Sequence, residues 1–166
     1  MSQVTSTGPA WLTAAGAGAR WLVGIIFVVA GLAKAYEPVL FYWEAISYVE
    51  LLNIERESWP QLGALAVFVL PVLETGVGVA LIANWHRRWT LSLAIAMIGL
   101  FIALTGHAWQ QGAEINCGCF GTLAERTPGE ALVEDLFMMG ALLVAWRWGT
   151  ERWVPSLALR RVILGV

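Results

Sequence analysis

Charged residues are scarce in this sequence. Only 13% of its 166 residues are Asp, Glu, Lys or Arg, while 58% are hydrophobic, which excludes an average soluble domain and is typical of a membrane protein. The formal net charge of -2, taken alone, excludes a basic nucleic-acid-binding protein. No Lys or Arg precedes Arg20, and no short apolar core with a cleavage site follows. We therefore expect a retained first helix and no secretory signal peptide.

Cysteine is rarer still, with two residues, Cys117 and Cys119. This number excludes a disulfide framework and leaves one pair, one edge of a metal site, or two inert thiols.

Long apolar runs, in contrast, fill most of the chain. Four of them approach the roughly 20 residues that a spanning helix needs, at about 16–35, 61–83, 89–109 and 131–148. They predict an all-α integral membrane four-helix bundle in a single membrane domain, 1–166. Residues 39–52 are nearly all apolar with polar side chains at spacing three, which predicts a short interfacial helix. The arginines after residue 150 predict a basic amphipathic tail.

The distribution of Lys and Arg predicts the orientation in the membrane. The connections after the first and third runs are acidic on balance, whereas Arg87 and Arg88 form a basic turn after the second run and the tail is rich in arginine. The positive-inside rule then places both termini and the basic turn in the cytoplasm. The loop 112–129, which contains both cysteines, is predicted to be extracytoplasmic.

The spacing of the cysteines favours reversible redox chemistry. Residues two apart are at most about 7 Å apart, and a disulfide needs Cα atoms about 4.4–6.8 Å apart, so closing the Cys117–Cys119 ring requires the tight bend that Gly118 permits. Such a bond would close almost no loop and contribute little to folding. A strained disulfide is easily reduced, so we interpret the pair as a catalytic dithiol in an outward redox loop.

Two other interpretations of the pair stay open. Copper(I) needs only two soft thiolates, and inert loop thiols need no function. A zinc site would need four nitrogen or sulfur ligands, and His107 is the one nearby histidine. We therefore predict no structural metal.

Three charged residues lie within or at the ends of the apolar runs. Glu74 is too deep to reach water by snorkelling and needs a partner or a proton. Lys34 ends the first run, where its long side chain, like that of Arg20, can snorkel to the interface. Asp135 enters the fourth run on the same side. We predict a Lys34 to Asp135 pair beneath the cysteine loop, with a packing role favoured over a proton relay.

Two further residues lie near the cysteines in the sequence. His107 lies ten residues before Cys117 and Arg126 seven after Cys119. Either could stabilise a thiolate, although an interfacial histidine and a solvated arginine are the simpler interpretations.

Three motifs make the sequence resemble a known family. They are Gly-Leu-Ala-Lys at 31–34, Pro-Val-Leu-Glu at 71–74 followed by Gly76 and Gly78, and Cys-Gly-Cys-Phe-Gly at 117–121. On these the chain resembles the methylamine utilisation MauE proteins, within the wider DoxX-like group of four-helix membrane proteins. The sequence departs from the expected pattern at Glu134, where we expect an arginine.

The resemblance implies a membrane protein linked to extracytoplasmic thiol/disulfide handling. It also implies a thioredoxin-like partner and, through the DoxX-like proteins, a link to quinone. We therefore predict a component of a thiol-disulfide oxidoreductase system, with electrons passing to a quinone or to a second protein. The rival prediction is a non-catalytic subunit of a larger membrane complex, in which the loop only staples or docks.

Overall fold

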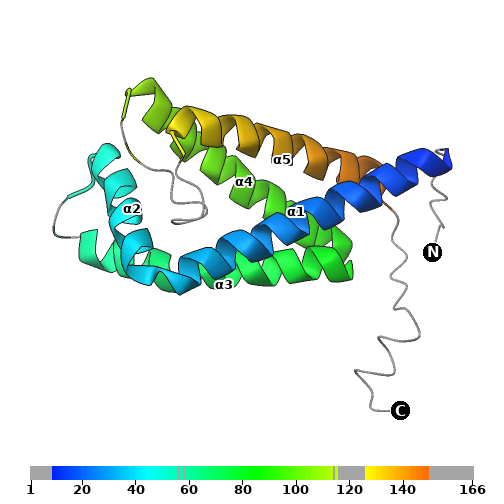
Figure 1. Cartoon of the computed structure of the whole chain (residues 1–166), viewed down its shortest axis with the longest axis horizontal. Helices are drawn as coiled ribbons and strands as arrows, with labels where there is room; N and C mark the ends of the chain where they lie inside the picture. The colour runs from blue at the N-terminus through cyan, green and yellow to red at the C-terminus, as the bar shows by residue number, and fades with distance from the viewer. Residues whose placement is uncertain (1–8, 56, 58, 114, 116–125, 150–166) are drawn as a thin grey trace, which may run out of the picture.

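The computed structural model describes residues 9–55, 57, 59–113, 115 and 126–149 (Figure 1). Cys117, Gly118 and Cys119 lie outside the described residues. Within the described ranges there is no strand, so the all-α prediction is confirmed for this part of the chain. The helices are α1 (Ala10–Tyr36), α2 (Pro38–Leu51), α3 (Trp59–Ala83), α4 (Arg87–Gln110) and α5 (Pro128–Trp148).

The four long helices, α1, α3, α4 and α5, alternate in direction, and the short α2 lies across one end of them (Figure 1). α1 packs along both α3 and α5, α4 packs mainly on α5, and α2 packs on α3. We call the end that carries α2 the α2 end; α1 and α4 finish there, and α3 and α5 begin there. We call the opposite end, where α4 begins at Arg87, the Arg87 end.

Three of the described helices, α1, α3 and α4, are long and apolar enough to cross a membrane. α5 has 21 residues but carries Glu130, Glu134, Asp135 and Arg147, so a fourth span stays a prediction. α1 begins at Ala10, earlier than the apolar run from residue 16 indicated. Ala10, Leu12, Ala14 and Ala15 in its first turns are among the residues that favour a helix most.

Local sequence explains where several helices begin. Pro38 occupies the first turn of α2, where its missing N–H costs nothing and its fixed φ suits the helix. Thr127 and Glu130 form a capping box at the start of α5, with the Thr127 N–H 2.9 Å from Glu130 Oε2 and the Glu130 N–H donor 3.3 Å from Thr127 Oγ1. α5 therefore begins at a defined point just after the cysteine-containing connection.

Close contact between α1 and α3 depends on glycine. A Cβ added at Gly31 would lie 2.8 Å from the carbonyl oxygen of Pro71, and one added at Gly78 would lie 2.7 Å from that of Gly24. Any side chain at these positions would force the helices apart. The absence of Cβ atoms therefore brings the faces of α1 and α3 that carry charge into contact.

At the Arg87 end, arginines bind the carbonyl groups that finish two helices. Arg20 donates to the carbonyls of Leu81 and Ile82 at the end of α3, and Arg87 donates to those of Ala145 and Trp146 in α5, each at 2.7 Å. We expected Arg20 to snorkel to the interface, but it is only 9% exposed. Carbonyls in the last turn have no partner within the helix, and they carry its negative dipole end, so they attract the guanidinium inward.

Candidate functional site

The described residues on both sides of the cysteine segment meet at the α2 end. α4 ends at Gln110 and α5 begins at Pro128, and a Cβ added at Gly129 would lie 3.1 Å from the indole of Trp109. The connection that contains Cys117 and Cys119 therefore starts and finishes at neighbouring points, although the cysteines themselves lie outside the described residues. Their chemistry stays a prediction.

A buried ion pair joins α1 to α3 at this end. Lys34 Nζ lies 2.8 Å from Glu74 Oε2 and 3.0 Å from Glu74 Oε1, and the two residues are 4% and 2% exposed. The Lys34 ammonium also lies 5.6 Å from the ring centroid of Phe41 in α2, within cation–π range. The sequence allowed the Lys34 side chain to snorkel to the interface. It is instead buried inside the protein, because Glu74 lies within reach where glycine brings α1 and α3 into close contact.

Asp135 is the second buried carboxyl group of this site. It is 2% exposed, and its Oδ2 lies 3.4 Å from Thr105 Oγ1 of α4. The Thr105 hydroxyl has one proton and a closer acceptor, the Phe101 carbonyl at 2.8 Å. Thr105 is the donor in both contacts, so the 3.4 Å contact to Asp135 is the weaker of the two.

One small cavity brings these groups together. Its volume is about 30 Å³, which is enough to hold a water molecule. Lys34, Glu74 and Asp135 all line it, so the structure brings together the three charged residues that the sequence singled out. The carboxylate in direct contact with Lys34 is that of Glu74, for which the sequence named no partner. A direct Lys34 to Asp135 pair stays a prediction. We call Lys34, Glu74 and Asp135, which share this cavity, the Lys34 cluster.

Arg126 and Glu134 form an ion pair beside the Lys34 cluster. Glu134 also lines the cavity, and Arg126 lies just before α5. The chain has Glu134 where we expect an arginine, and the partner of Glu134 in this ion pair is Arg126. The pair is partly exposed and contributes little to stability. A role for Arg126 at a thiolate stays a prediction.

His107 lies in the last turn of α4, where its Nε2 is 3.4 Å from Gln111 Nε2. This contact is between residues four apart on one helix face. Its predicted influence on the thiols concerns residues outside the described part of the chain.

Sequence reasoning missed two residues at the site. Thr105 is hard to find, because a threonine in an apolar helix commonly bonds its own helix, as Thr105 does with Phe101. Glu44 belongs to the polar stripe of α2, and its Oε2 is buried without a hydrogen bond. Burial raises the pKa of the Glu44 carboxyl, while nearby Lys34 opposes the rise and Glu37 adds to it.

Comparison with known proteins assigns the chain to a family. No solved structure matches it. Protein TlpB of Flavobacterium psychrophilum is 24% identical over 128 residues, which are 75% of this chain and 34% of TlpB, so the chain spans about a third of that relative's length. The model of the family "Methylamine utilisation protein MauE" matches residues 10–147, from the start of α1 almost to the end of α5. This membrane protein therefore belongs to the MauE family.

Proposed function

We propose that the protein is a membrane thiol/disulfide redox protein that exchanges disulfides with a partner protein through Cys117 and Cys119. The observation that supports the proposal is that the described residues on either side of the cysteine segment, the end of α4 and the start of α5, lie at the end of the bundle where the Lys34 cluster is buried. Membership of the MauE family supports it, because the family resemblance implies extracytoplasmic thiol/disulfide handling.

The exchange proceeds in two successive thiol/disulfide displacement steps. The thiolate of one cysteine attacks the partner's disulfide, a mixed disulfide forms, and one partner sulfur leaves as a thiolate and takes a proton. The second cysteine then displaces the other partner sulfur, which also takes a proton. The chain changes from dithiol to disulfide while the partner changes from disulfide to dithiol, and the reverse direction uses the same steps.

In this proposal the bundle comprises α1, α3, α4 and α5 as four spans, with α2 at the membrane surface. Both termini lie in the cytoplasm and the cysteine loop lies outside, as the charge distribution indicates. This arrangement puts the Lys34 cluster below the loop, with the basic turn at Arg87 and Arg88 on the opposite side.

The Lys34 cluster serves as a proton-holding support for the loop. One ammonium and two carboxylates leave one negative charge in excess, and an uncompensated charge in an apolar interior is costly. A proton on Asp135 restores neutrality. Asp135 can release or take up this proton when the charge of the cysteine loop changes, as when a thiolate forms there.

The cavity of the Lys34 cluster does not fit a quinone ring. Its volume of about 30 Å³ is far below the 300 Å³ or more of small-molecule sites in general. For the chemistry at this end we propose that the electrons pass to a second protein, of the thioredoxin-like kind that the resemblance implies.

Trapping the mixed disulfide tests this function. Cys117→Ser and Cys119→Ser variants would be purified from membranes without reductant, with the double variant as control. We expect a covalent, dithiothreitol-sensitive adduct from at least one single variant and none from the double variant. The absence of an adduct from both single variants would contradict disulfide exchange and favour the non-catalytic subunit.

The redox state of the pair separates the same two functions. Alkylation of Cys117 and Cys119 across a series of glutathione buffers is expected to titrate within the range of the extracytoplasmic compartment. A pair that stays oxidised under strong reductant would instead be a staple.

A further inference from the structure

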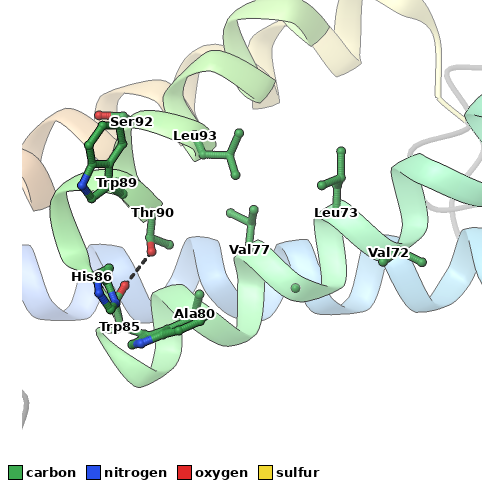
Figure 2. Close-up of a pocket in the computed structure, with 11 residues that line it drawn as sticks. Val72, Leu73, Val77, Ala80, Trp85, His86, Trp89, Thr90, Ser92 and Leu93 are labelled. Atoms are coloured by element: carbon green, nitrogen blue, oxygen red, sulfur yellow. Dashed lines mark hydrogen bonds between the residues drawn. The ribbon is translucent and has the colours of Figure 1, made fainter.

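Two hollows of the described bundle differ in character. The larger, of about 820 Å³, lies between α3 and α4 at the Arg87 end, and mostly apolar side chains such as Val72, Val77 and Leu93 line it (Figure 2). The smaller is the cavity of about 30 Å³ at the Lys34 cluster. The polar groups that line the smaller cavity are specific enough to indicate what it holds.

Four polar side chains line the small cavity, and the rest of its lining is apolar. The four come from three helices and are Lys34 of α1, Glu74 of α3, and Glu134 and Asp135 of α5. A buried water needs about two to four polar partners. The Lys34 ammonium disfavours a metal cation, and the carboxyl groups disfavour an anion. A single water molecule therefore fits both the size and the polarity of the cavity.

Asp135 is the residue that most needs such a partner. It is 2% exposed, and its one hydrogen bond within the described residues is the 3.4 Å contact from Thr105 to Oδ2. Buried polar groups almost always have hydrogen-bond partners, and a carboxyl group has several acceptor sites. Because Asp135 lines the cavity, a water bound there supplies the partner that Thr105 alone does not.

Glu134 links this cavity to the solvent. Its side chain lines the cavity and is nevertheless 42% exposed, so one carboxyl group reaches both sides. Neighbouring residues on a helix do not face each other, so Glu134 and Asp135 need a molecule between them in order to exchange a proton. The cavity that both residues line is the place for that molecule.

We propose that the cavity binds one water molecule and that a proton passes through this water between Glu134 and Asp135. Glu134 takes a proton from the solvent and donates it to the water, which donates one of its own protons to the Asp135 carboxylate. One proton moves inward and no other reactant is consumed. The inference rests on the proposed role of Asp135 as the proton-holding group, but it does not need the chemistry of the cysteines.

Hydrogen–deuterium exchange of the Asp135 carboxyl group tests this path. The full chain with both Cys117→Ser and Cys119→Ser would be reconstituted in lipid and mixed rapidly with D₂O, and the infrared band that Asp135→Asn removes would be followed with time. We expect Glu134→Gln, which cannot release a proton, to slow the exchange about a hundredfold, the lower end of what a positioned proton-transfer group contributes. Glu134→Asp keeps a carboxyl group and should restore most of the rate.

Two control variants separate proton transfer from other roles of charge. Arg126→Gln removes the ion pair of Glu134 but keeps its carboxyl group, so the rate should change less than about fivefold, the most that a partly exposed ion pair contributes. Glu44→Gln removes another carboxyl group near Lys34 that is not among the described residues lining the cavity, and the rate should not change. Slowing by either variant as strong as that by Glu134→Gln would overturn the path.

A cavity-filling variant tests the water itself. Ala131 lines the cavity and is 3% exposed, so Ala131→Val adds two methyl groups where the water is bound. We expect the exchange to slow as in Glu134→Gln and the Asp135 band to move to higher wavenumber, because its carbonyl loses a hydrogen bond. Ala145→Val is the matched control, since Ala145 is also buried in α5 but is not among the residues lining the cavity. It should leave the rate and the band unchanged.

The outcomes separate this inference from the proposed disulfide exchange. Exchange at the parent rate in Glu134→Gln would overturn the path, whether or not Ala131→Val folds. If Asp135→Asn removed no band, both the path and the proton-holding role of Asp135 would be wrong, while disulfide exchange would be untouched. A missing mixed disulfide would contradict disulfide exchange and leave this measurement, made without the cysteines, as it is.

Discussion

The two ends of the bundle use buried charge in different ways. At the Arg87 end, Arg20 and Arg87 donate to backbone carbonyls at the ends of α3 and α5. At the α2 end, Lys34 meets the side chain of Glu74, and Asp135 lies in the same cavity. A backbone carbonyl cannot change its charge, whereas a carboxylate can take a proton. The Arg87 end therefore holds contacts of fixed charge between helices, whereas the α2 end gathers side chains whose charge can change.

The largest effect that we expect comes from breaking the buried ion pair. Glu74→Leu leaves the Lys34 ammonium buried without its carboxylate partner, and we expect a loss of about 3–5 kcal/mol in the free energy of unfolding. Unfolding in mixed micelles measures this loss.

The double variant Lys34→Met with Glu74→Leu is the control for lost packing. Replacing a whole buried pair by apolar residues is often nearly neutral, so most of the stability should return while thiol/disulfide exchange stays impaired. A double variant as unstable as Glu74→Leu would show that packing, and not charge, accounts for the loss.

The next effect concerns the opposite end. Arg20→Met removes the hydrogen bonds to Leu81 and Ile82, and we expect a loss of about 2–3 kcal/mol, since hydrogen bonds to a charged group contribute about 1.5–3 kcal/mol. The rate of exchange with the partner, measured in the folded fraction, should not change. A slower exchange in Arg20→Met would remove the distinction between the two ends.

Much of this architecture follows from the sequence. Apolar runs predicted the long helices, and the run at 39–52 predicted α2 close to its observed bounds, Pro38–Leu51. The sequence did not identify Glu74 as the partner of Lys34, because that contact depends on how α1, α3 and α5 are rotated about their axes relative to one another.

A signal for that partner was nevertheless present. Gly31 lies three residues before Lys34, and Gly78 four residues after Glu74, so each charge shares a helix face with a glycine. Two helices that meet through glycine bring such charges together. The cysteine pair offers no such signal. The spacing of Cys117 and Cys119 predicts a chemical reaction but not where the pair lies in the fold, and the structure describes only the residues on either side of it.

A smaller effect is expected at Asp135. Asparagine has nearly the same shape and can donate to Thr105, so it replaces a protonated Asp135 well, and Asp135→Asn should change the free energy of unfolding by less than about 1 kcal/mol. Infrared difference spectra of wild type should show a protonated carboxyl band that is missing from the variant. If Asp135→Asn were as destabilising as Glu74→Leu, or if the carboxyl band were unchanged in this variant, Asp135 would not be the group that carries the proton.

The smallest effect lies at the start of α5, beside the cysteine segment. Hydrogen bonds from the Thr127 N–H and hydroxyl lower the pKa of the Glu130 carboxyl. A lowered pKa in the folded state gives stability that is present above the unfolded value, near 4.5, and that is lost as pH falls through the folded value. The thermal midpoint of wild type should therefore decrease below about pH 4.5, and Glu130→Gln should remove that part of the decrease. Glu37→Gln, at the α1–α2 junction, is the control, and an equal effect there would mean that the capping box does not anchor the segment.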